Sequence, residues 1–138
     1  MEHKVTVITD YDASRLNVLL NQAEHWPDPN KDHIRLLKQK IASAQVTGQK
    51  EVPPYLVTMN SHVRVTDLGQ KRNLIFWLSY PEDALFGDDK VSVLSPIGTA
   101  VLGAKVGDVV HVDNGRKKTQ LRVAQLYYQP EDYEHYTL

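Results

Sequence analysis

The sequence predicts an α+β protein in which an N-terminal antiparallel helical hairpin, a short coiled coil, precedes a β-rich unit. The apolar residues recur at spacings of three and four in the first third of the chain, and the period becomes strand-like after Pro53 and Pro54. Pro27 and Pro29 interrupt the helical part, because a proline lacks an N–H and clashes with the preceding turn. We therefore expect a helical hairpin over residues 1–50 and a β domain over residues 51–138.

Two amphipathic helices are expected in the hairpin. The first apolar stripe consists of Leu16, Leu19, Leu20 and Ala23. The second consists of Ile34, Leu37, Ile41 and Ala44. These spacings predict helices over about residues 11–25 and 31–47, with Thr9 and Asp10 offering the first N-cap. Helices of about 15 residues are only about 22 Å long, so the predicted hairpin is short.

The β domain should contain about five strands around one short helix. Strand-like runs occupy residues 56–59, 62–65, 74–80, 91–94, 109–112 and 120–126, and residues 4–8 suit a further short strand or an extended lead-in. Ser95 and Pro96 predict a helix start, since serine caps the first turn and proline fits the first helical position. Gly103 should end this helix near residue 102. We expect a strongly twisted antiparallel sheet wrapped around that helix.

Composition limits the classes of function. The chain has no cysteine, which excludes disulfides, thiolate metal sites and thiol nucleophiles. Its 16 basic and 17 acidic residues leave a net charge of −1, which argues against direct high-affinity binding of nucleic acid and favours a protein partner. There is no apolar run long enough to span a membrane and no secretion signal, so we expect a cytoplasmic protein. The oligomeric state stays open.

One long segment carries a family resemblance. Residues 91–108, VSVLSPIGTAVLGAKVGD, closely resemble the signature of the C-terminal domain of Gre-type transcription elongation factors. NSHV at 60–63 resembles a strand start of the same domain. The stretches VTMNS at 57–61, SYP at 79–81 and YQPE at 128–131 resemble a short-hairpin branch of that family. The resemblance implies an FKBP-like β domain and a bacterial factor that binds RNA polymerase near its secondary channel. Nucleic acid would then be met only through the polymerase, and no cofactor is implied.

The resemblance also implies a docking loop. It comprises Leu94, Ser95, Pro96 and Ile97. Some relatives carry an acid just before the Ser-Pro pair, whereas this chain has Leu94, so a contact based on charge is not expected there. The factor would modulate elongation, or compete with longer Gre factors, without catalysis.

The tip of the predicted hairpin carries three acids, Glu24, Asp28 and Asp32. Long-armed Gre factors use an acidic tip to help hold a catalytic metal, which requires two neighbouring carboxylates at the reaction centre. The arm predicted here is too short for that reach, so we expect no catalysis. Stimulation of transcript cleavage through Asp28 and Asp32 remains the first alternative.

Three other groups of residues are candidates for function. Lys31, Arg35 and Lys38 form a basic stripe on the second helix, which is either a solvated face or a contact with RNA or an acidic wall. The six histidines lack the i, i+4 pairing of a helical metal site, and we expect no metal. An aromatic groove would suit a peptide-binding or prolyl isomerase module, the second alternative; its candidates are Trp77, Tyr80, Phe86, Tyr127 and Tyr128.

Overall fold

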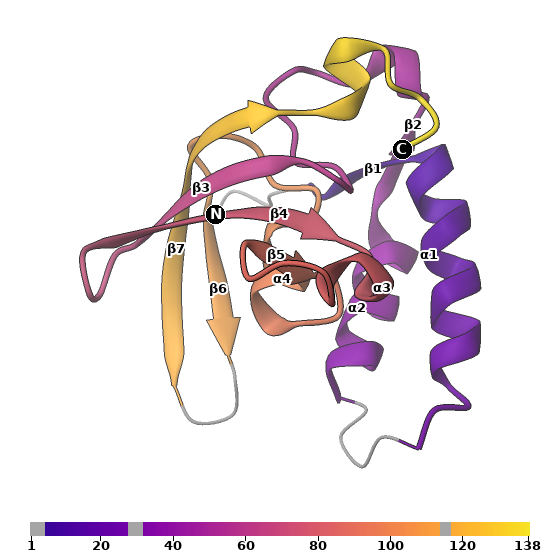
Figure 1. Cartoon of the computed structure of the whole chain (residues 1–138), viewed down its shortest axis with the longest axis horizontal. Helices are drawn as coiled ribbons and strands as arrows, with labels where there is room; N and C mark the ends of the chain where they lie inside the picture. The colour runs from indigo at the N-terminus through magenta and orange to yellow at the C-terminus, as the bar shows by residue number, and fades with distance from the viewer. Residues whose placement is uncertain (1–4, 28–31, 114–116) are drawn as a thin grey trace.

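The computed structural model describes residues 5–27, 32–113 and 117–138, and it shows a curled sheet flanked by helices (Figure 1). The elements in chain order are β1 (Val7–Thr9), α1 (Asp10–Ala23), α2 (Asp32–Ser43), β2 (Gln45–Thr47), η1 (Gln49–Glu51), β3 (His62–Asp67), β4 (Arg72–Ser79), α3 (Pro81–Ala84), β5 (Lys90–Ser92), α4 (Pro96–Val101), β6 (Val109–Asp113), β7 (Lys118–Tyr128) and η2 (Pro130–Tyr133). The mixed helix and strand content confirms the α+β class.

The main sheet has five strands in the order β5-β4-β3-β7-β6. Three of its four pairings are antiparallel, but β5 pairs with β4 in parallel, so the expectation of a purely antiparallel sheet was wrong. The chain leaves β4, turns through α3 and returns alongside β4 in the same direction. The predicted strand at residues 56–59 is also absent, since only Leu56 forms a bridge, to Lys105. Leu56, Val57 and Met59 are nevertheless buried, so this apolar run reflects core packing without strand pairing.

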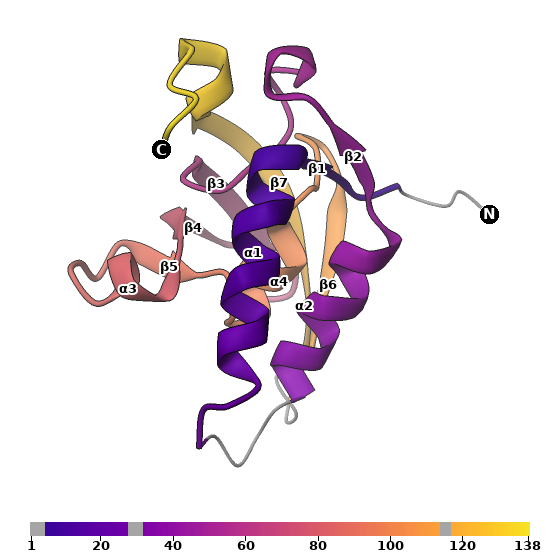
Figure 2. The same ribbon diagram turned by 90° about the vertical axis from the view of Figure 1, so that its right-hand side faces the viewer.

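The helices α1 and α2 lie side by side and run in opposite directions (Figure 2). Both are shorter than predicted, with 14 and 12 residues. Thr9 caps α1 as expected, because its hydroxyl accepts a hydrogen bond of 2.9 Å from the Asp12 N–H. A parallel two-stranded sheet of β1 and β2, which pairs Val7 with Gln45, joins the two helices at one end. The sequence did not predict β2.

The helices and the main sheet share one hydrophobic core. The buried residues Leu16 and Leu20 of α1 and Leu37 of α2 belong to the same cluster as Val63 of β3 and Val101 of α4. Burial of these side chains, at about 1.5–3 kcal/mol each, therefore stabilises the helices only when they lie against the sheet. The position of α2 relative to α4 is set by this common core.

Gly103 allows β1 to pack closely against the segment that follows α4. Its φ of +78° is a conformation that favours glycine, and a Cβ there would lie 2.9 Å from the carbonyl oxygen of Val7. The predicted helix end at Gly103 is thus also a packing position. Among the described residues, no helix is long and apolar enough to cross a membrane.

Candidate docking site

The Ser95–Pro96 loop has a backbone held by hydrogen bonds. The Ser95 hydroxyl accepts a hydrogen bond of 3.1 Å from the Gly98 N–H and donates one of 2.7 Å to the carbonyl of Ser92. The Thr99 hydroxyl donates to the carbonyl of Val93 at 2.7 Å. Pro96 occupies the first turn of α4, as predicted from the sequence. The loop that presents Pro96 is therefore preorganised.

Gly98 permits the tight contact between α4 and β5. A Cβ at this position would lie 2.1 Å from the carbonyl oxygen of Ser92, closer than two atoms can approach without moving the backbone. The glycine of the Ser-Pro-Ile-Gly run is thus required by packing between the helix and the preceding strand.

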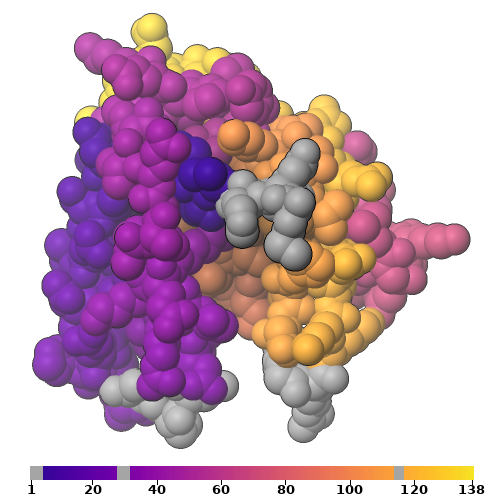
Figure 3. Space-filling view, turned by 180° about the vertical axis from the view of Figure 1, so that it is seen from behind, coloured from indigo at the N-terminus to yellow at the C-terminus, as the bar shows by residue number. Residues whose placement is uncertain are grey.

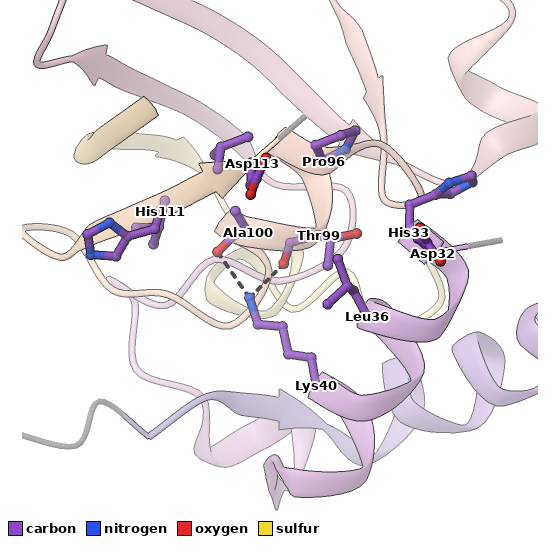
Figure 4. Close-up of a pocket in the computed structure, with 11 residues that line it drawn as sticks. Asp32, His33, Leu36, Lys40, Pro96, Thr99, Ala100, His111 and Asp113 are labelled. Carbon is purple, nitrogen blue, oxygen red and sulfur yellow. Dashed lines mark hydrogen bonds between the residues drawn. The ribbon is translucent and has the colours of Figure 1, made fainter. Parts of the chain in front are cut away.

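A pocket of about 710 Å³ lies beside this loop, between α2, α4 and β6 (Figure 4). Seen from behind, the surface is hollowed between α2, in purple, and β6, in orange (Figure 3). Leu36, which is 56% exposed, and Pro96 contribute apolar surface to its wall. The remaining lining residues are Asp32, His33, Lys40, Thr99, Ala100, Val110, His111, Val112 and Asp113. Its mixture of apolar and ionisable side chains suits a protein segment better than a purely hydrophobic ligand.

Lys40 connects α2 to α4 at the pocket wall. Its ammonium group donates hydrogen bonds to the carbonyl oxygens of Thr99, at 2.6 Å, and Ala100, at 3.0 Å (Figure 4). These carbonyls belong to the last turn of the short helix, where backbone acceptors lack helical partners. Burial lowers the pKa of Lys40 to about 8. Lys40 was not predicted as a site residue from the sequence. Its position next to the buried Ile41 was the only sequence feature that placed it near the core.

The four residues of the predicted docking loop have different environments. Pro96 is exposed, Ser95 and Ile97 are half-buried, and Leu94 is buried in the core. Leu94 therefore anchors the loop from within, whereas Pro96 faces solvent. Asp32, predicted as part of the hairpin tip, lies at the same pocket as Pro96.

The acids of the predicted tip pair with the basic stripe. Glu24 accepts a hydrogen bond from the ammonium group of Lys38, and a guanidinium nitrogen of Arg35 lies 3.6 Å from a carboxylate oxygen of Asp32. Ion pairs at such exposed positions contribute little stability, but they reduce the local charge of both groups. Asp28 and Lys31 lie outside the described residues. Within the ranges that the structure describes, no group of three or more His, Asp or Glu side chains could hold a metal ion.

The predicted aromatic groove is not a single surface. Trp77 stacks on His62 with ring centroids 4.2 Å apart, and Tyr128 is tilted against Trp77. Tyr80 is buried beneath the guanidinium of Arg15, which lies 4.2 Å from its ring centroid. Phe86, in contrast, is 81% exposed. Trp77, Tyr127 and Tyr128 therefore gather around His62, whereas Tyr80 and Phe86 lie in separate environments.

A buried polar cluster joins α1 to the β domain and was missed by the sequence reasoning. Asp12 is 1% exposed and accepts a hydrogen bond of 3.1 Å from the Met59 N–H, while Thr58 donates one of 2.6 Å to Glu131. Burial raises the pKa of Asp12 to about 7 and raises the pKa of Glu131 as well. Asp12 lies four residues before the buried Leu16, on the apolar stripe of α1, and that placement was the available signal.

The described residues thus form a sheet covered by two short helices, with a hydrogen-bonded Ser-Pro loop beside a surface pocket. Comparison with known proteins identifies the class. The family model for the C-terminal part of the transcription elongation factors GreA/GreB matches residues 53–128. The chain belongs to the GreA/GreB family, and the resemblance of residues 91–108 is thereby confirmed.

The individual relatives extend the similarity to nearly the whole chain. The "Regulator of nucleoside diphosphate kinase" of Escherichia coli (strain K12) is 35% identical over 132 residues, covering 95% of each protein. GreA of Clostridium botulinum (strain Eklund 17B / Type B) is 28% identical over 79% of this chain and 68% of its own. A solved GreA/GreB-type elongation factor from Nitrosomonas europaea superimposes with a TM-score of 0.70 and 31% identity, covering 91% of this chain and 100% of that one.

Proposed function

We propose that this chain binds RNA polymerase near the secondary channel and modulates transcription elongation by occupying that site, without catalysing a reaction. The observation that carries the proposal is the exposed Pro96 on a hydrogen-bonded loop at the rim of the pocket between α2, α4 and β6. A preorganised loop loses little conformational freedom on binding, which favours affinity. Family membership supports the choice of RNA polymerase as the partner.

We further propose that residues 51–138 supply most of the affinity, with Leu36 of α2 completing the pocket wall, and that residues 1–50 also supply obstruction. With 14 and 12 residues, α1 and α2 have lengths of only about 21 and 18 Å. We expect so short an arm to end outside a buried reaction centre, which favours regulation by occupancy over delivery of carboxylates to a metal. A bound factor excludes longer-armed rivals according to its concentration relative to its dissociation constant.

The docking proposal is tested by binding to purified RNA polymerase. We expect Pro96→Arg and Leu36→Glu to weaken binding about tenfold or more, because each places charge on the apolar part of the pocket wall. Val46→Ser is the matched control, since Val46 is 54% exposed on β2, outside the pocket. Unchanged binding by both pocket variants would refute this docking surface.

The absence of catalysis is tested on a stalled elongation complex. The factor should not stimulate transcript cleavage, and it should reduce cleavage caused by an added GreA protein as its concentration rises. Cleavage that depends on Asp28 and Asp32 would instead favour the cleavage-factor alternative.

Two finer points belong to the same proposal. The main sheet with α4 would correspond to an FKBP-like fold. If this fold serves docking alone, an assay with a short proline-containing peptide should detect no prolyl isomerisation. The relative in Escherichia coli is named for nucleoside diphosphate kinase. An effect of this chain on that enzyme would arise indirectly, through transcription.

A further inference from the structure

The loop between β4 and β5 exposes two large apolar side chains. Leu85 is 83% exposed and Phe86 is 81% exposed, whereas the next most exposed large apolar side chain of the described residues, Val18, reaches 59%. Single apolar residues at a surface are ordinary, whereas adjacent large apolar side chains exposed to this extent make a candidate for an interaction site. We call Leu85 and Phe86 the apolar tip.

The apolar tip is held on an ordered frame. The Phe86 N–H donates to the carbonyl of Asp83 at 3.1 Å, and the Trp77 N–H donates to the carbonyl of Asp89 at 2.8 Å. Pro81 begins α3, and the parallel pairing of β5 with β4 fixes the far end of the loop. In Figure 2 the segment of α3 and β5 projects sideways from the body, away from α2. The backbone therefore presents the two side chains outward in a defined conformation.

Acidic side chains surround the apolar tip. The four exposed acids are Glu82, Asp83, Asp88 and Asp89. Lys90, which is half-buried, is the one basic residue of the segment from Pro81 to Lys90. The local charge is therefore strongly negative although the net charge of the whole chain is only −1. A complementary surface must combine an apolar pocket with a basic rim.

We infer that the apolar tip inserts into a hydrophobic pocket bordered by Lys or Arg side chains on RNA polymerase, as a second contact beside the Ser95–Pro96 loop. This inference rests on the proposed function. Residues 87–94, which include β5, join the two contacts along the chain, so a partner that meets both must extend from the Ser95–Pro96 loop around to the loop between β4 and β5. The acids disfavour a lipid surface, because cytoplasmic membranes carry negative charge themselves.

The test measures binding of the full chain to purified RNA polymerase at two salt concentrations. Leu85→Ser combined with Phe86→Ser should weaken binding about tenfold or more, as expected for buried apolar anchors. Val18→Ser is the matched control for a loss of exposed apolar surface on α1. Changing the four acids to their amides should weaken binding at low salt and reduce its dependence on salt. Thermal unfolding of each variant should match the wild type, because these side chains make little contact with the core.

The outcomes distinguish the inference about the apolar tip from the proposed function. Wild-type affinity of the tip variants, with binding still lost on Pro96→Arg, would overturn the inference and leave the proposed function intact. Failure of the wild-type chain to bind RNA polymerase would refute the proposed function, and the inference with it. Binding of the wild type to anionic vesicles, lost with the tip variants, would identify a lipid partner and also overturn the inference.

Discussion

The substitution Asp12→Asn should remove a pH-dependent loss in the free energy of unfolding. Asp12 is buried at the junction of α1 and the β domain, and its pKa of about 7 lies above the ordinary value of 3.8. Because the folded state favours the protonated carboxyl, Asp12 makes its full contribution to the free energy of unfolding below about pH 4. This contribution is lost as the pH rises through 7. A difference of about three pKa units at 1.36 kcal/mol each corresponds to a loss of about 4 kcal/mol between pH 4 and pH 8.

The assay is urea unfolding of the wild type and Asp12→Asn between pH 4 and pH 8. The asparagine keeps an oxygen to accept the Met59 N–H, so the two proteins should have similar free energies of unfolding near pH 4. Near pH 8 the variant should be more stable, while a residual slope remains from Glu131, whose pKa is also raised. Asp10→Asn, at an exposed position of the same helix, is the control. Parallel curves for the wild type and Asp12→Asn would refute this reasoning.

Three further predictions concern the docking loop and pocket. Ser95→Ala removes the cap of α4 and should lower the free energy of unfolding by about 1 kcal/mol in chemical denaturation, and an unchanged value would contradict the role of the cap. Gly98→Ala forces a Cβ against Ser92 and should cost about 3 kcal/mol or more, so a folded variant of wild-type stability would contradict the packing. The Lys40 Cε resonance in NMR should titrate with a midpoint near 8, whereas a midpoint near the ordinary value of 10.5 would mean that the ammonium group is not buried.

The sequence predicted most elements because their signals are local. The stripe through Leu16 and Leu20 located α1, and Ser95 with Pro96 located the start of α4, since helix periodicity and capping depend on residues within a few positions. The parallel course of β5 was not predictable in this way. It depends on how the chain returns after α3, and pairing partners distant in sequence leave no local pattern.

The candidate site likewise has parts that the sequence predicted and parts that it could not predict. Pro96 could be named in advance because the segment around it resembles a known family, and the acids of the hairpin were plain in the sequence. The pocket beside Pro96 could not be predicted, because it requires α2 and β6 to lie against α4. Glu24 and Lys38 are 14 residues apart, and only the packing of α1 against α2 makes them partners.

By itself, the sequence determined the α+β class, the short helical arm, the capped Ser-Pro loop and membership of a transcription factor family, because periodicity, capping and a long motif are all properties of neighbouring residues. Tertiary structure alone decided that Asp12 is buried and Lys40 half-buried, each with a shifted pKa, that Leu94 lies in the core, and that Leu85 and Phe86 face solvent. The physical reason is that burial is set by what the rest of the chain places over a side chain, and no local pattern contains that information.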